Sequence, residues 1–192
     1  AAQIAAQPGV DAVVPSQTRF PQTDAGPTWI GAPHLWDGSQ TGGIAGTLGE
    51  GSIIGIIDTG INLDHPSFAA VGGDGYVHSN PRGTGNYLGH CASQPAISIC
   101  NDKLIGAYSW PETGDNPEDD FGSGHGSNVA GIAAGNIISA AYTAPTTVLT
   151  ATLSGVAPHA NIIAYDVCLA GSCPDEISLL AVEQAILDGV DV

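Results

Sequence analysis

The stretch from Ser52 to Asp58, SIIGIID, is an almost continuous apolar run that ends in an acidic residue. A strand that is buried on both faces of a parallel sheet has this pattern. Residues 161–167 (NIIAYDV) form a second run of this kind, and residues 103–110 (KLIGAYSW) predict a third strand. Because helical patterns alternate with the strands, the sequence predicts an α/β fold, a three-layer, doubly wound and mostly parallel sheet.

Two helices are predicted between and after these strands. Small apolar residues recur at helical density after Gly124 and indicate a helix that packs tightly in the interior. Residues 177–189 (ISLLAVEQAILDG) predict a second helix, which stops at Gly189. Residues 190–192 (VDV) are typical of the start of another strand, so we expect the sheet to be incomplete in this chain.

The remaining segments are predicted to be irregular. Residues 1–23 combine a helix-forming stretch, a short strand pattern and a proline-rich linker, and they are expected to be separate from residues 24–192. The segment from Trp29 to Trp36 is expected to pack on the main body. Residues 39–51 are rich in glycine and predict a loop, and a long loop region follows from about residue 62 to residue 121.

Charge excludes several classes of function. The chain has 192 residues, 43% of them hydrophobic, and 19 acidic residues against three basic ones, which gives a net charge of −16. This charge repels phosphate backbones and anionic lipid, so neither nucleic acid nor a membrane surface is an expected partner. The sequence contains no run of about 18 apolar residues, so it predicts no membrane span.

The chain contains four cysteines, Cys91, Cys100, Cys168 and Cys173. Their spacings do not match a structural zinc site. Four cysteines allow three disulfide connectivities, and proximity along the chain favours Cys91–Cys100 and Cys168–Cys173. Four reduced thiols are the alternative. Two disulfides would indicate an oxidising compartment, and therefore export.

Asp58 and His125 are the candidate catalytic residues. Asp58 stands at the carboxyl end of a predicted parallel strand, the sheet edge that hosts active sites in α/β folds, although an acid there can also simply cap a turn. His125 lies between Gly124 and Gly126 at the predicted start of a helix, and these glycines leave room for a close approach to the imidazole. The positive end of the helix dipole is expected to disfavour the protonated ring and keep it available as a base.

Four stretches carry a family resemblance. They are IIGIIDTGINLDHPSF (53–68), GSGHGSNVAGIAAG (122–135), SGVAPHANIIAYDVC (154–168) and EISLLAVEQAILDGVDV (176–192). The first resembles the aspartate motif of the subtilisin-like serine proteases (subtilases, peptidase family S8), and the second resembles their histidine motif, normally HGTHVAG. The resemblance covers about residues 51–192. Residues 100–127 further resemble members that carry a protease-associated insert.

The resemblance implies a secreted serine endopeptidase that acts through an Asp-His-Ser triad. Asp58 and His125 would be the first two members. The family's Gly-Thr-Ser motif is not found in these 192 residues, so we expect the serine to follow the end of this sequence and the chain alone to be inactive. The expected partners are protein or peptide substrates, an inhibitory propeptide and the remainder of the catalytic domain, which carries the serine.

The resemblance also divides the chain. Residues 1–23 resemble the tail of the family's inhibitory propeptide and a linker, and residues 24–192 would be the N-terminal portion of the catalytic domain. No cofactor is expected for the chemistry. A loop with four acidic residues could bind a structural calcium ion through its oxygen atoms, or it could simply be solvated. These residues are Asp115, Glu118, Asp119 and Asp120.

Two alternatives to a triad protease remain, and the other histidines are assigned separately. A pseudoprotease or binding module would keep the fold and lack the serine. An aspartic protease is suggested by Asp58-Thr59-Gly60, but that class needs two such aspartates on an all-β frame. The other histidines share no ligand spacing and are expected to be structural or exposed. These are His34, His65, His78, His90 and His159.

Overall fold

The fold is an α/β structure built on a parallel sheet. The computed structural model describes residues 3, 7, 9–10, 25–93, 100–114, 116–119, 124–144, 147–168 and 172–192. Its main sheet has the order β1 (Ile53–Asp58), β6 (Asn161–Asp166), β3 (Leu104–Tyr108) and β2 (Leu88–Gly89). All three strand pairs are parallel, and the pairing of β1 with β6 places Asp58 beside Asp166. The predicted fold class is confirmed, and the three strands singled out in the sequence form the centre of the sheet.

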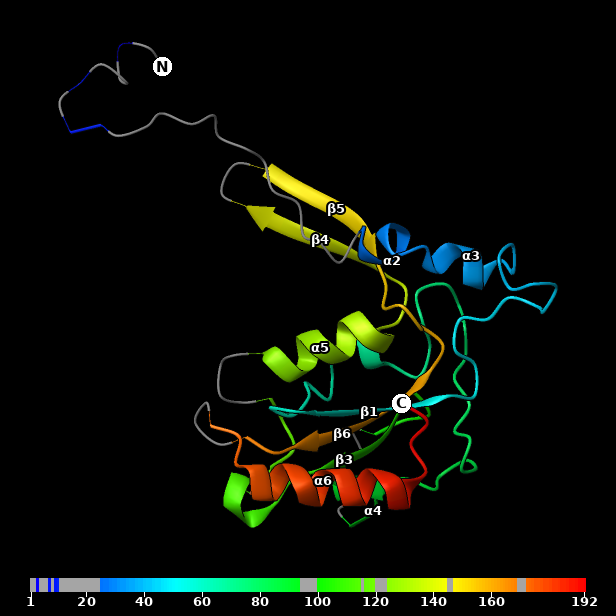
Figure 1. The fold of residues 1–192 in the computed structure, drawn as a ribbon, viewed down its shortest axis with the longest axis vertical. Helices are drawn as coiled ribbons and strands as arrows, with labels where there is room; N and C mark the ends of the chain where they lie inside the picture. Colours follow the sequence, from blue (N-terminus) through cyan, green and yellow to red (C-terminus); the bar gives the residue numbers. More distant parts are fainter. Residues whose placement is uncertain are drawn as a thin grey trace.

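Two helices cover opposite faces of this sheet, which gives three layers (Figure 1). Helix α5 (His125–Ala134) lies on one face and helix α6 (Asp175–Asp188) on the other. The side chains of β6 alternate between them, with Ile162 in the core on the α5 side and Ile163 in the core on the α6 side. Both residues are fully buried. A strand of this kind must be apolar on both faces, and this requirement explains the continuous apolar run in the sequence.

The segment after α6 pairs with the outer edge of β1. Gly189 ends the helix in the left-handed conformation, with φ of 71°. The N–H of Asp191 then donates to Ile53 O, and the N–H of Gly55 donates to Val192 O, both at 2.9 Å. The predicted start of a further strand is therefore seen only as backbone hydrogen bonds to β1, since residues 190–192 do not form a strand in the structure.

The tryptophan segment packs only in part. Helix α2 (Gly26–Trp29) and helix α3 (Ala32–Trp36) occupy it. The indole of Trp36 donates a hydrogen bond to Val156 O at 2.9 Å. Trp29, however, is 85% exposed, so the expectation that this segment packs on the main body does not hold for Trp29.

A two-stranded hairpin was missed by the sequence analysis. Strands β4 (Ile138–Ala144) and β5 (Thr147–Leu153) pair antiparallel and project away from the main sheet (Figure 1). Alanine, serine and threonine fill most of these positions, so the apolar alternation that announces a strand is weak.

Short helical turns complete the described structure. They are the 3-10 turns η1 (Pro66–Phe68) and η3 (Pro111–Thr113) and helix α4 (His90–Ser93). Both disulfides pair as proximity favoured: Cys91–Cys100 and Cys168–Cys173. The second bridge joins the end of β6 to the start of α6. Among the described residues, no helix has the length and apolar character needed to cross a membrane.

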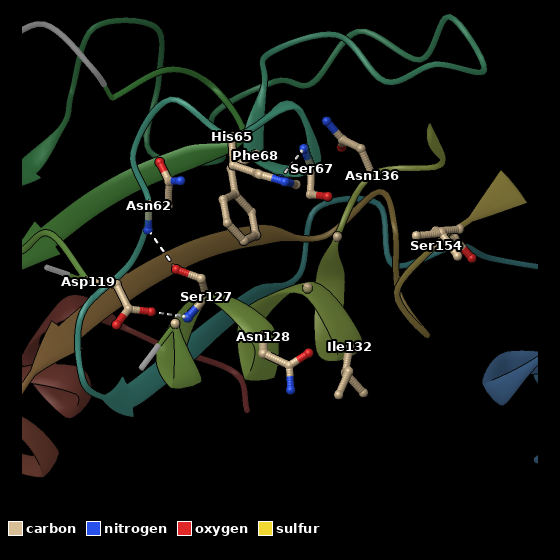
Figure 2. Close-up of a pocket in the computed structure, with 14 residues that line it drawn as sticks. Asn62, His65, Ser67, Phe68, Asp119, Ser127, Asn128, Ile132, Asn136 and Ser154 are labelled. Atoms are coloured by element: carbon tan, nitrogen blue, oxygen red, sulfur yellow. Dashed lines mark hydrogen bonds between the residues drawn. The ribbon is translucent and has the colours of Figure 1, made fainter. Parts of the chain in front are cut away.

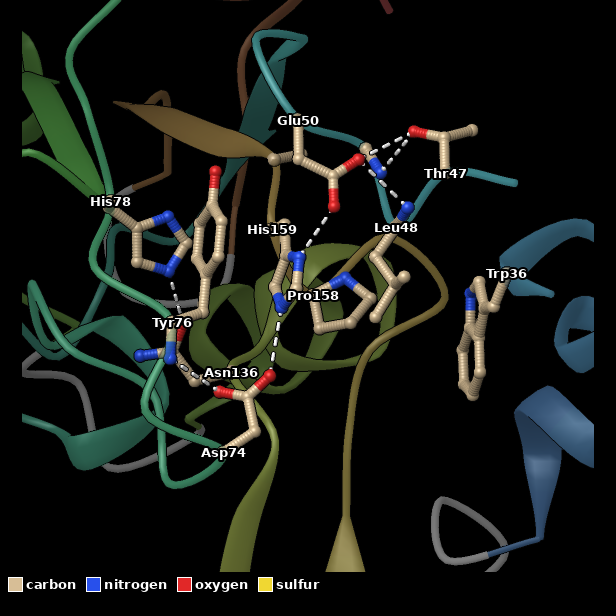
Figure 3. Close-up of polar contacts among 12 residues, drawn as sticks. Trp36, Thr47, Leu48, Glu50, Asp74, Tyr76, His78, Asn136, Pro158 and His159 are labelled. Carbon is tan, nitrogen blue, oxygen red and sulfur yellow. Dashed lines mark hydrogen bonds and ion pairs between the residues drawn. The ribbon is translucent and has the colours of Figure 1, made fainter. Parts of the chain in front are cut away.

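An ionic cluster around His159 ties three loops together (Figure 3). His159 Nδ1 contacts Glu50 Oε1 at 2.6 Å, and Nε2 contacts Asp74 Oδ2 at 2.9 Å. Tyr76 stacks on the imidazole with a centroid distance of 3.7 Å. Both ring nitrogens of His159 are therefore held by carboxylates. His159 is thus structural, as expected.

The contribution of this cluster to the stability of the fold depends on pH in the acidic range. Partial burial raises the pKa of Glu50, but hydrogen bonds from His159, Thr47 and Leu48 outweigh it and hold the pKa at about 2, below the ordinary 4.5. The neighbouring His78 stays neutral, since burial lowers its pKa to about 4. A lowered carboxyl pKa stabilises the fold above the ordinary value, and this contribution is lost as the pH falls through the folded value.

We therefore expect Glu50→Gln to lower the unfolding temperature of the full-length protein by about 2 °C above pH 5, a small change because a partly exposed pair is screened by solvent. The difference from wild type should vanish as the pH approaches 2. Calorimetry between pH 2 and 7 measures it, with Glu183→Gln on the exposed side of α6 as the control. A difference that stays constant with pH would contradict this account.

A second prediction concerns a polypeptide limited to residues 1–192. Helix α6 exposes a broad apolar surface, which includes Leu179 (65%), Ile186 (74%) and Leu187 (77%). Exposed patches and sheet edges of this kind promote association. We expect this polypeptide to aggregate or to lack fixed tertiary packing. A sharp, cooperative thermal transition of a monomer would show the prediction to be wrong.

Candidate active site

Asp58 and His125 meet at the carboxyl edge of the sheet. Asp58 is the last residue of β1 and His125 is the first residue of α5. They are 67 residues apart in sequence, and His125 Nδ1 lies 2.7 Å from Asp58 Oδ1. Because a carboxylate can only accept, the imidazole proton in this bond resides on Nδ1. The structure therefore brings together the two residues that the sequence analysis selected.

Two glycines allow this approach. A Cβ atom at Gly126 would collide with the carbonyl oxygen of Gly60, and a Cβ atom at Gly60 would lie 2.7 Å from Pro117 O. Gly60 also has φ of 93°, a conformation that disfavours other residues. The space at Gly126 is thus occupied by the turn after Asp58, not by the approach to the imidazole that the sequence analysis expected.

The turn and the helix are also joined by hydrogen bonds (Figure 2). The N–H of Asn62 donates to Ser127 Oγ at 2.8 Å, so the hydroxyl that stands where the family motif has threonine is used for packing. Thr59 and Asp119 make further bonds to the first turn of α5. The sequence analysis did not identify these two roles, although Thr59 adjoins Asp58 and Asp119 precedes the histidine motif.

His125 is the more exposed partner of the pair. Its side chain is 64% exposed and that of Asp58 is 17% exposed. The hydrogen bond that His125 donates to Asp58, and then the charge of Asp58, raise the pKa of His125 above its ordinary 6.5. The expectation that the helix N-terminus keeps the ring deprotonated is therefore wrong in direction. The adjacent carboxylate favours the imidazolium more strongly than the helix dipole opposes it.

The arrangement is that of a general base with its orienting acid. Asp58 also accepts a hydrogen bond from the N–H of Thr59 at 2.8 Å, which fixes the carboxylate that faces the ring. With Nδ1 committed to Asp58, Nε2 is the nitrogen that can take a proton from a neighbouring hydroxyl. Exposure at the sheet edge makes the ring accessible to such a group.

A groove of about 320 Å³ runs from this point along the outer side of α5 (Figure 2). It lies between the loop after β1 and the helix. Asn62 and Asp119 lie toward one end in Figure 2 and Asn136 and Ser154 toward the other, with Phe68 between them. Gly124, next to His125, is among the lining residues. Its lining is mixed and contains several amide and hydroxyl groups, so it suits a polar, extended occupant better than a purely apolar one.

The acidic loop before α5 does not form a metal cluster in the part of the chain that the structure describes. Both carboxylate oxygens of Asp119 accept hydrogen bonds, from Thr59 and from Ser127. Glu118 is exposed, and Asp115 and Asp120 lie outside the described residues. No group of three or more His, Cys, Asp or Glu side chains suited to a metal ion occurs among the described residues. A structural calcium ion remains a prediction.

Known proteins resemble the chain over most of its length. The Arabidopsis thaliana protein called subtilisin-like protease SBT1.4 is 34% identical over 205 residues, which cover 96% of this chain and 24% of that protein. Subtilisin-like protease SBT2.6 of the same plant is 36% identical over 86% of this chain and 21% of its own length. Subtilisin-like protease SBT1.9 is 37% identical over 75% of this chain and 20% of its own length. The chain thus spans about a quarter of the length of the curated relatives it matches.

The family match agrees with the fold and with the paired side chains. The model of the subtilase family matches residues 49–192, three-quarters of the chain. This range contains β1, α5, β6 and α6, and so both members of the Asp58–His125 pair. The parallel sheet and this match exclude the aspartic-protease alternative. The chain belongs to the subtilase family of serine proteases.

Proposed function

We propose that the protein is a secreted serine endopeptidase, and that this chain supplies Asp58 and His125 of its Asp-His-Ser triad. The observation that carries the proposal is the 2.7 Å hydrogen bond between His125 Nδ1 and Asp58 Oδ1 at the carboxyl edge of the sheet. The serine would come from the sequence that follows Val192. The substrates would be proteins or peptides.

In the proposed mechanism, His125 Nε2 takes the proton of the serine hydroxyl as its oxygen attacks a peptide carbonyl carbon. The imidazolium then gives this proton to the leaving amine, and an acyl-enzyme remains. Water, deprotonated by the same nitrogen, attacks the ester carbonyl carbon. The imidazolium then returns the proton to the serine oxygen as the ester bond breaks and the acid product leaves. Asp58 holds the ring in the required tautomer and stabilises the imidazolium in both steps.

The proposal also includes secretion and the removal of a propeptide. Two disulfides within the described residues support folding in an oxidising compartment, and therefore secretion. Residues 1–23 are proposed to be the tail of an inhibitory propeptide, with the catalytic domain beginning near residue 24. Most of this segment lies outside the described residues.

A pseudoprotease is the second candidate, because the 192 residues contain no Gly-Thr-Ser motif. Both candidates share the fold and the Asp58–His125 pair. They differ in the gene downstream of Val192. A Gly-Thr-Ser motif followed by small apolar residues would identify the protease, and a substituted serine would identify the binding protein.

We expect the full-length protein to hydrolyse a fluorogenic peptide and to be inactivated by a fluorophosphonate. His125→Ala or Asp58→Ala should lower kcat at least about 1,000-fold, since the triad acts as a unit. His34→Ala, at an exposed histidine of α3, is the matched control and should keep full activity. Because the pKa of His125 is raised, activity should rise with pH through a midpoint above 6.5. An active His125→Ala variant would refute the assignment.

The electrostatic role of Asp58 can be measured without turnover. Asp58→Asn removes the carboxylate that stabilises the imidazolium, so the pKa of His125 should fall towards its ordinary 6.5. The chemical shift of the imidazole Cε1 proton, followed against pH by NMR, reports this value. An unchanged pKa in the variant would contradict the proposed pairing.

A further inference from the structure

The first turn of α5 is capped by residues from outside the helix. Its N-cap residue is Gly124, which has no side chain to accept from the exposed N–H groups. Instead, the N–H of Gly126 donates to Thr59 Oγ1, and the N–H of Ser127 donates to Asp119 Oδ2, each at 2.9 Å. Thr59, from the turn after β1, and Asp119, from the loop before α5, thus replace the missing cap.

These two caps are coupled to each other. The hydroxyl of Thr59 donates to Asp119 Oδ1 at 3.0 Å while it accepts from Gly126. The backbone N–H of Thr59 donates to Asp58. A continuous path of hydrogen bonds therefore joins Asp119 to the end of β1 and to the start of α5. These are the two segments that carry Asp58 and His125.

Asp119 is itself held in place by the backbone. Its N–H donates to Ile61 O at 3.3 Å, and the N–H of Ile61 donates to Pro117 O at 3.0 Å. The loop at residues 117–119 is thus paired with the turn after β1. Because the backbone of Asp119 is fixed, its carboxylate cannot move along with the helix. It therefore restrains the first turn of α5 against shifts.

We propose that Asp119 is a positioning residue for the Asp58–His125 pair. The inference rests on the proposed function, because it assigns Asp119 a role in the same hydrolysis. Asp119 contacts neither ring nitrogen of His125 in the hydrogen bonds described above. It fixes the first turn of α5 against the end of β1, so that His125 Nδ1 stays at hydrogen-bond distance from Asp58. A displacement of about 1 Å in such a pair can cost about 100-fold in rate.

The charge of Asp119 supports the same role. The hydrogen bond and the charge of Asp58 make the largest contributions that raise the pKa of His125, and the charge of Asp119 adds a smaller one in the same direction. A carboxylate at a helix N-terminus is also favourable against the helix dipole. Removing Asp119 should therefore change both the placement of the ring and its protonation.

The test compares Asp119→Ala and Asp119→Asn with Asp64→Ala and Asp64→Asn in the full-length protein. Asp64 is an exposed aspartate in the same turn region, so its variants make identical changes of charge and size. We expect Asp119→Ala to lower kcat about 10- to 100-fold with KM changed less than about threefold, and to move the acidic limb of the pH profile to lower pH. Asp119→Asn retains one acceptor oxygen and should lose less. Both Asp64 variants should match wild type.

The coupling to Thr59 provides a second readout. Thr59→Val removes the hydroxyl that joins the two caps, and Thr59→Ser restores it. We expect Thr59→Ser to be close to wild type, and the double variant Thr59→Val/Asp119→Ala to be little worse than either single variant. Fully multiplicative losses in the double variant would overturn the proposal, as would an Asp119→Ala enzyme with the kcat of Asp64→Ala.

An NMR titration separates this proposal from the proposed function. In the Asp119→Ala protein, the pKa of His125 should be lower than in wild type, whether or not the protein hydrolyses peptides. An inactive wild-type protein with this shift would refute the protease assignment and support the positioning role. An active wild-type enzyme without the shift, and with unchanged kcat in Asp119→Ala, would refute the positioning role alone.

Discussion

The close contact between the turn after β1 and the first turn of α5 is the constraint on which the site depends. Gly126 makes it possible, because a Cβ atom there would collide with the carbonyl oxygen of Gly60, and Gly60 in turn leaves room for the backbone of Pro117 and Glu118. The contact brings a strand end and a helix start within one hydrogen bond of each other. The hydroxyls of Thr59 and Ser127 then accept hydrogen bonds from the backbone N–H groups of Gly126 and Asn62. The contact therefore does not leave these N–H groups without partners.

The layer order of the fold explains why these two segments meet at all. A helix that follows a parallel strand runs back along the sheet, so its N-terminus lies at the carboxyl edge of the strands. The α5 face is built from small residues, with Ala130 and Ala134 fully buried, and this lets the helix lie close to β1. On the opposite face larger side chains meet, such as Tyr165 of β6 and Ile177 of α6. The sheet is thus packed tightly on the α5 side, where the placement of His125 relative to Asp58 must be accurate.

Sequence patterns predicted the main helices and strands of this structure, and much less of the tertiary contacts between them. Continuous apolar runs and a terminal glycine are strong local patterns, so β1, β6 and the end of α6 were identified correctly. The β4–β5 hairpin escaped because its alanines and threonines carry little periodicity, and Trp29 was misplaced because exposure depends on the tertiary surroundings. The direction of the His125 pKa was wrong for a related reason. The helix dipole is visible in the sequence, but the 2.7 Å distance to Asp58 that outweighs it is not.

The same contrast separates the choice of catalytic residues from their support. Asp58 and His125 could be named from their neighbours in sequence, because each sits at the end of an element that its own pattern defines. The role of Asp119 depends on two hydrogen bonds to residues of other segments, and an acidic loop offers many carboxylates of equal appearance. Of the two carboxylates of this loop that the structure describes, Glu118 is exposed, whereas Asp119 contacts Thr59 and Ser127. The identity of the reacting pair therefore follows from the local sequence at a strand end and a helix start. The alignment of the pair depends instead on how these two elements pack together.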